Sequence, residues 1–166
     1  MFVFKEIQRL RQWWILLFQL TVLGLISYGL ISQLIFDIPF GDKPISNLGL
    51  IIIAILIFLF IMTLFLIKLE TIITSKGIQF GFKPFQRKGI SYSWNEIHSI
   101  VVSNYNPLTD FGGWGWRISL KGKGQAYTIS GNYGILIKLK NGKVRLVGTK
   151  KPNEVKRVLS QINLSD

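Results

Sequence analysis

Two long apolar runs in the first 69 residues constrain this chain more than any other feature. Residues 13–36 read WWILLFQLTVLGLISYGLISQLIF without one charged side chain, and residues 48–69 carry only Lys68, close to their end. At about 1.5 Å of rise per residue, each run is long enough as a helix to cross a hydrocarbon layer of about 30 Å. The sequence therefore predicts two transmembrane spans, 13–36 and 48–69.

The segment between the two runs, DIPFGDKPISN, is short and contains two prolines and a glycine. Such a segment turns the chain and does not form a domain, so residues 13–69 are expected to form a transmembrane hairpin. A cleaved signal peptide is the competing interpretation of the first run. The run is too long for one, has no small-residue cleavage site, and is followed at once by the second run.

Basic side chains are distributed unevenly around the two spans. Three precede the first span, Lys43 alone lies between the spans, and four follow within residues 76–88. Lysine and arginine are enriched in cytoplasmic segments. We therefore expect a multi-pass protein of the bacterial cytoplasmic (inner) membrane with both termini in the cytoplasm, and most of the net charge of +12 lies on that side.

The segment 1–12, ahead of the first span, mixes apolar and charged side chains and is expected to form a short helix in the membrane interface. An open alternative is that its apolar side chains dock on a partner or on the C-terminal part of the chain. Tryptophan and the snorkelling lysine favour the headgroup level. The expected membrane anchors are Trp13, Trp14 and Lys68.

The first span also carries a stripe of small and polar residues spaced by three and four positions. Such a stripe allows two helices to approach closely and to form hydrogen bonds. It packs either on the second span or on another subunit, and the oligomeric state stays open. The stripe comprises Thr21, Gly24, Tyr28 and Ser32.

After the second span the apolar pattern changes to a period of two, which is typical of strands. Seven strands are predicted, over residues 72–75, 78–82, 97–105, 116–121, 127–130, 134–140 and 143–148. A helix is expected over residues 152–164, because apolar residues fall on one face there. Residues 70–166 are therefore expected to form one small α+β domain.

The dipeptide Asn141-Gly142 predicts a two-residue type I′ turn between the last two strands. In that register Lys140 lies opposite Lys143, and further basic residues share their face. Like charges facing each other cost free energy, so this face is a candidate for binding lipid headgroups or an acidic partner. A solvated face is the alternative. The predicted anionic-surface site comprises Lys138, Lys140, Lys143 and Arg145.

The long connection over residues 104–116, NYNPLTDFGGWGW, combines a carboxylate with large aromatic side chains and glycines. Connections of this length without structure of their own are often functional, and aromatic and arginine side chains dominate interface hot spots. The alternative is a glycine corner that covers the domain's own core or touches the bilayer. The predicted partner- or ligand-binding residues are Asp110, Phe111, Trp114, Trp116 and Arg117.

Seven antiparallel strands followed by one helix are the order of the pleckstrin-homology-like (PH-like) barrel. The stretches RLRQWW, IPFGDKP, FGGWGWRI and LKNGKVRLVGTKKPNEV make the whole chain resemble bacterial membrane proteins in which a two-helix transmembrane hairpin precedes a PH-like domain. The resemblance implies an α+β membrane protein with a bent, seven-stranded antiparallel domain and a C-terminal helix. It implies no activity, and no phosphoinositide site is carried over, because the first predicted turn of the domain offers only Lys76.

Catalysis finds little support in the composition. The chain has no cysteine, its only histidine is His98, and the five acidic residues after the second span are scattered. The sequence pI of about 10.1 makes nucleic-acid binding a hypothesis to consider, but no nucleic-acid motif accompanies it. We expect no enzyme, no metal, no cofactor and no nucleic acid.

The leading hypothesis is a membrane-anchored, non-catalytic binding or scaffolding module. It would act as an accessory subunit that presents its C-terminal domain to a protein partner on the cytoplasmic side. The alternative is a module that senses an anionic lipid or a small ligand through the basic hairpin.

Overall fold

The computed structural model describes residues 2–119 and 122–163, which form two compact units. One unit holds the two apolar helices, from Arg11 to Leu66. The other combines the segment up to Leu10 with the described residues from Ile67 onward. The N-terminal segment thus belongs to the same unit as the C-terminal domain, which the sequence placed at 70–166.

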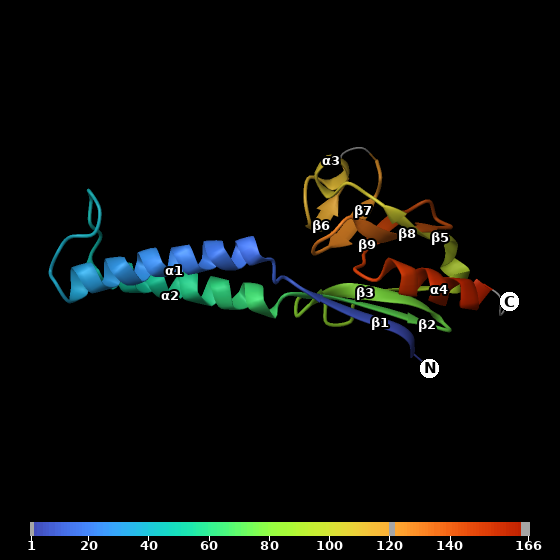
Figure 1. Cartoon of the computed structure of the whole chain (residues 1–166), viewed down its shortest axis with the longest axis horizontal. Helices are drawn as coiled ribbons and strands as arrows, with labels where there is room; N and C mark the ends of the chain where they lie inside the picture. Colours follow the sequence, from blue (N-terminus) through green and yellow to red (C-terminus); the bar gives the residue numbers. More distant parts are fainter. Residues whose placement is uncertain (1, 120–121, 164–166) are drawn as a thin grey trace. The chain divides into compact units, whose positions relative to one another are not determined.

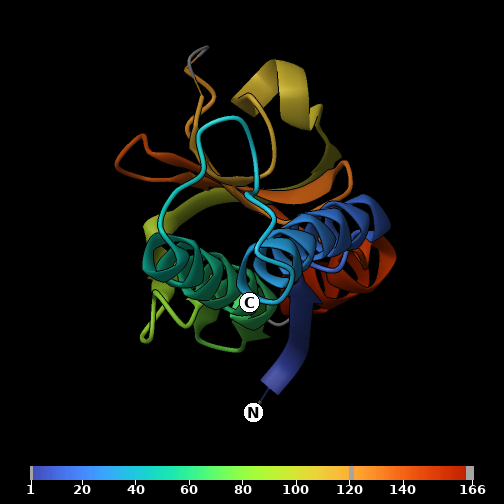
Figure 2. The same cartoon turned by 90° about the vertical axis from the view of Figure 1, so that its left-hand side faces the viewer.

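The helical unit contains α1 (Trp13–Leu34) and α2 (Asn47–Leu66), which lie side by side in Figure 1 and Figure 2. Both helices are long and apolar enough to cross a membrane, judged by length and composition. The second apolar run is a helix only as far as Leu66, because Lys68 already begins a strand. Lys68 therefore lies two residues beyond the helix, at the beginning of a strand, and the second span is shorter than the predicted 48–69.

The polar stripe of α1 does not pack on α2 as a whole. Only Ser32 of the four predicted residues is buried. An ideal Cβ built on Gly24 would meet no atom within 4 Å, so α2 does not approach that position. The exposed members of the stripe are Thr21, Gly24 and Tyr28.

Gln33 supplies the polar contact that holds the connection between the two helices. Its Nε2 donates to the carbonyl oxygen of Ile45 at 2.8 Å and to Oδ1 of Asn47 at 2.9 Å. Gly29 faces the ring of Phe40, where a Cβ would approach to 2.9 Å. The end of α1 is thus tied to the beginning of α2 by hydrogen bonds, and the connection packs closely on α1 through Phe40.

The described part of the second unit folds as two sheets and two helices (Figure 1). In spatial order the first sheet contains β1 (Phe2–Arg9), β2 (Lys68–Thr74), β3 (Gly77–Lys83) and β4 (Ile90–Ser93). The second contains β5 (Ile97–Asn104), β8 (Tyr133–Leu139), β9 (Val144–Gly148), β7 (Gln125–Thr128) and β6 (Gly115–Ile118). The 3-10 turn η1 (Trp94–Glu96) connects β4 to β5, the helix α3 (Pro107–Phe111) lies between β5 and β6, and the helix α4 (Pro152–Asn163) follows β9.

The α+β class and the C-terminal helix are confirmed, but the prediction of seven antiparallel strands is wrong. Strands β1 and β4 are additional, and β7 pairs with β9 in parallel. The predicted strand 116–121 ends at Ile118, and its residues 120 and 121 lie outside the described part. Residue 164, the predicted end of the last helix, lies outside it as well.

Strand β1 replaces the interfacial helix predicted for residues 1–12. It pairs antiparallel with β2, so that Arg9 lies opposite Lys68. Burial alternates along it: Phe4, Glu6 and Gln8 are buried and the residues between them are exposed. A period of two belongs to a strand, not to a helix. Strand β1 therefore leads into α1, and α2 leads into β2, and these two strands are neighbours in one sheet.

The main core lies between the two sheets and α4. Both sheets contribute fully buried aliphatic and aromatic side chains, and α4 closes the cluster with Val155 and Leu159. A second, smaller cluster lies on the other face of the second sheet, under α3. Its buried members are Tyr105, Phe111, Ala126 and Leu146.

The hairpin between β8 and β9 has a different turn from the one predicted. The Gly142 amide donates to the Leu139 carbonyl oxygen at 3.0 Å, and the Leu139 amide donates to the Lys143 carbonyl oxygen at 2.9 Å. Gly142 is left-handed at φ 80°, whereas Asn141 has a negative φ, which a type I′ turn forbids. The loop has three residues, and the register moves by one.

This change of register divides the predicted basic hairpin between two faces. Arg145 lies opposite Ile137, and Lys138 lies opposite Val144. A shift of one residue turns every side chain of a strand to the other face. The prediction that the four basic residues share one face is therefore wrong, because Arg145 and Lys138 point to opposite sides.

We expect Gly142→Ala to lower the free energy of unfolding by about 1–2 kcal/mol, the cost of holding an L-residue in the left-handed region. The effect belongs to the backbone alone, since the new Cβ would meet no atom within 4 Å. Denaturant unfolding of the full chain in detergent measures it, with the exposed neighbour Lys140→Ala as the control. Equal stability of both variants would contradict the left-handed conformation of Gly142.

Candidate functional site

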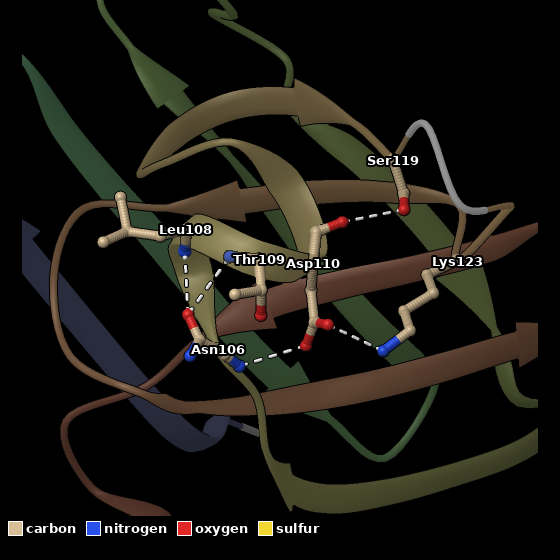
Figure 3. A network of polar contacts seen from close by, with 6 residues as sticks. All are labelled: Asn106, Leu108, Thr109, Asp110, Ser119 and Lys123. Atoms are coloured by element: carbon tan, nitrogen blue, oxygen red, sulfur yellow. Dashed lines mark hydrogen bonds and ion pairs between the residues drawn. The ribbon is translucent and has the colours of Figure 1, made fainter.

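The connection between β5 and β6 contains the short helix α3, where the sequence predicted no regular structure. The Oδ1 atom of Asn106 caps this helix by accepting from the amides of Leu108 at 3.1 Å and Thr109 at 3.2 Å (Figure 3). Pro107 takes the first helical position, and Gly112 ends the helix in a left-handed conformation. The connection is therefore an ordered lobe.

Asp110 holds this lobe together. Its Oδ2 accepts from the Asn106 amide at 3.0 Å, and its Oδ1 pairs with Nζ of Lys123 at 2.7 Å (Figure 3). Its carbonyl oxygen accepts from the Ser119 hydroxyl at 2.8 Å. The carboxylate is thus engaged within the lobe and is not presented to a partner.

Phe111 and Trp114 also stabilise the lobe. Phe111 is buried beside Tyr105, with ring centroids 6.2 Å apart, and burial raises the pKa of the Tyr105 phenol. Trp114 is half-buried, and its Nε1 donates to the carbonyl oxygen of Gly131 at 2.9 Å. These two predicted site residues therefore pack against the domain itself.

Trp116 differs from the other predicted residues because its side chain is 60% exposed. It lies on β6 and stacks on Tyr127 with ring centroids 6.2 Å apart and an interplanar angle of 16°. Ile118, two positions along the same strand, is 65% exposed. Sequence reasoning missed Ile118, although its alternation with Trp116 was a signal for a shared face.

Arg117 projects to the other face of β6 and is exposed. Its Nε donates to the carbonyl oxygen of Trp114 at 3.2 Å. This single bond to a neutral acceptor leaves the guanidinium charge without a carboxylate within ion-pair distance in the described part of the chain. The arginine is therefore available to an acidic group.

Arg145 lies on the same face of the second sheet as Trp116 and Ile118. Gln125 of β7 pairs with Ile118 on one side and with Arg145 on the other, which fixes the common face. Arg145 is half-buried, and residues 2–119 and 122–163 give it no carboxylate partner. Burial raises the pKa of the neighbouring Tyr127, and the charge of Arg145 opposes that rise only in part.

The remaining predicted residues lie apart from this surface. Lys138, Lys140 and Lys143 are exposed at and near the tip of the β8–β9 hairpin. Trp13 and Trp14 are exposed at the beginning of α1 in the helical unit. In the described residues, no group of three or more His, Asp or Glu side chains is arranged to hold a metal ion.

The site that emerges is the surface of β6, formed by Trp116, Arg117 and Ile118. It joins an exposed aromatic ring, an exposed aliphatic side chain and a cation on one short strand, and the ordered lobe beside it holds the strand in place. Comparison of the chain with models of known protein families and with curated proteins gives no match.

Proposed function

We propose that the protein is a membrane-anchored, non-catalytic binding module. It acts as an accessory subunit that presents its sheet domain to a protein partner on the cytoplasmic side of a bacterial inner membrane. The observation that carries this proposal is the exposed pair Trp116 and Ile118 on β6. Tryptophan and arginine are enriched at interface hot spots, and neighbouring exposed apolar side chains mark an interaction surface.

The charge of the domain supports an acidic partner. Residues 68–166 hold sixteen basic and five acidic side chains. Arg117 and Arg145 flank the exposed pair on the two faces of the sheet and lack carboxylate partners in the described part. Complementary charge speeds association and fixes orientation, so acidic residues on the partner would match this surface.

The topology supports the membrane part of the proposal. Strands β1 and β2 pair directly. Strand β1 is followed along the chain by α1, and β2 is preceded by α2. If both helices cross the membrane, the N-terminal segment and the domain lie on the same side, and the excess of positive charge favours the cytoplasm. A PH-like relationship is supported by α4 against the core, while the parallel pair β7 and β9 departs from that pattern.

The test compares two full-length variants, purified in mild detergent from their own membranes. Trp116→Ala removes the exposed ring, and Leu108→Ala removes a side chain of similar exposure, 66%, from α3. We expect a stoichiometric protein partner with the wild type and with Leu108→Ala, and at least a tenfold loss with Trp116→Ala. Equal recovery of a partner with both variants, or recovery of lipid alone, would overturn the proposal.

A recess of about 330 Å³ beside α3 favours the small-ligand alternative. Leu136 and Leu146 line it together with Lys138, which has no carboxylate partner in the described residues. The lining also includes the ion pair of Asp110 with Lys123, so Lys138 is the cation left to hold a small anion whose hydrocarbon part packs on the leucines. Under this alternative, a medium-chain fatty acid such as decanoate binds the wild type, and Lys138→Glu abolishes that binding. Calorimetry measures the affinity of both proteins.

A further inference from the structure

The outer edge of β6 is free of other strands in the described part of the chain. Strand β6 is the last strand of the second sheet and pairs only with β7. The Ser119 amide donates to the Gly124 carbonyl oxygen at 2.8 Å, and the Gly115 amide donates to Thr128 Oγ1 at 3.3 Å. Odd-numbered amides therefore point toward β7.

Backbone groups alternate in direction along an antiparallel strand. The amide and carbonyl groups of Trp116 and Ile118 consequently point away from β7, toward the free edge. An edge with unpaired backbone groups is a template for pairing with another chain. Here the two residues that expose their backbone groups at the edge are also the two that expose apolar side chains.

We propose that the partner binds β6 as an added β-strand. This inference rests on the proposed function and specifies its chemistry: an extended peptide segment with apolar residues at alternate positions and an acidic residue between them. The apolar residues would lie beside Trp116 and Ile118 on one face. The acidic residue would lie beside Arg117 on the other.

A second copy of this chain fits the edge poorly. In the antiparallel self-pairing that uses both outward amides of β6 in each copy, Trp116 bonds to Ile118 across the two-fold axis, which places Arg117 directly opposite its own copy. Residues at such a non-hydrogen-bonded position lie close together, about 4.5 Å between Cα atoms, and like charges there repel. The basic domain adds to this repulsion, so an acidic segment of a different protein is the better occupant.

The experiment measures hydrogen exchange residue by residue on the full chain in detergent. The probe is a capped synthetic peptide in which valine alternates with glutamate, and its control is the same peptide N-methylated at every second residue. We expect saturating peptide to slow exchange at the amides of Trp116 and Ile118 at least tenfold. The Arg117 amide, which already points to β7, should change little, and the methylated peptide should protect neither residue.

Two variants at one position separate the backbone from the side chain. Ile118→Pro removes the outward amide, and proline is tolerated at such an edge position because that amide has no partner in the sheet. Ile118→Val keeps the amide with a similar side chain. Strand addition predicts at least a tenfold weaker peptide affinity with proline and less than a threefold change with valine.

Several outcomes would overturn the inference. If the peptide binds without slowing exchange at Trp116 and Ile118, docking is through side chains only, and the proposed function still stands on its own co-purification test. If the peptide does not bind, strand addition of this chemistry is wrong. Slow exchange of these two amides without peptide would also contradict it. The edge would then belong to a second copy if the slowing increases with protein concentration, or to lipid if the slowing requires added phosphatidylglycerol.

Discussion

Glu6→Ala is expected to lower the free energy of unfolding by about 3 kcal/mol or more. The Glu6 side chain is 5% exposed, and its carboxylate accepts from the Thr149 hydroxyl at 2.6 Å and from the Lys150 amide at 2.8 Å. Each hydrogen bond to a charged group contributes about 1.5–3 kcal/mol, and alanine leaves both donors without their acceptor. The carboxylate ties β1 to the segment between β9 and α4, so the loss reaches both sheets.

Denaturant unfolding of the full chain in detergent, followed by tryptophan fluorescence, measures this effect. Glu6→Gln keeps one acceptor oxygen and should lose about half as much. Lys5→Ala is the surface control, because the Lys5 side chain is half-exposed in its pair with Glu70 at 2.8 Å, and such a pair contributes about 1 kcal/mol or less. If Glu6→Ala were no worse than Lys5→Ala, β1 would not be an integral strand of the domain.

The N-terminal segment shows why local pattern was not enough. The alternation of apolar and charged residues in FVFKEIQR is compatible with a strand, but its position ahead of an apolar run favoured an interfacial helix. The deciding contacts join Glu6 to residues 143 and 144 positions later in the chain. Such contacts leave no signal in the neighbouring sequence, although the apolar helices themselves were predicted from their composition.

The β5–β6 connection and the β8–β9 hairpin show the opposite case, because the residues that determine their local structure are adjacent in the sequence. Asn106, Pro107 and Gly112 are the residues that begin and end α3, and they are visible in the sequence. Asn141-Gly142 marked the hairpin correctly but is compatible with two turn types, and the three-residue form moved Arg145 to the other face. Of the five predicted partner-binding residues, only Trp116 and Arg117 belong to the candidate site on β6. Ile118 is the residue that the structure adds to them.

The position of β6 at a sheet edge required the three-dimensional fold. Strand β7 pairs in parallel with β9, and this pairing carries β6 to the end of the second sheet. A meander of consecutive strands would have placed β6 beside β5 and covered its edge. Sequence patterns indicate where strands lie along the chain, but the order of strands in a sheet depends on which faces they bury together.

Tyr127→Ala is expected to lower the free energy of unfolding by about 3–5 kcal/mol, as large-to-small changes in an aromatic core do. Tyr127 is 2% exposed, and its ring packs against Phe80, with centroids 5.1 Å apart, and against Phe82 at 6.4 Å. Few domains have more than about 5–15 kcal/mol to lose. The same unfolding measurement in detergent applies.

Tyr127 also links the core to the binding surface, because Trp116 stacks on its ring. Under conditions where Tyr127→Ala is still folded, partner recovery should fall by at least tenfold, since Trp116 loses the platform that orients it. Tyr127→Phe keeps the ring and removes a hydroxyl that donates to Gln125 Oε1 at 3.3 Å and also interacts with the Trp116 side chain, so it should cost about 1 kcal/mol and lower recovery far less than the alanine variant does. Loss of recovery with the phenylalanine variant would mean that the hydroxyl, and not the stacked ring, organises the surface.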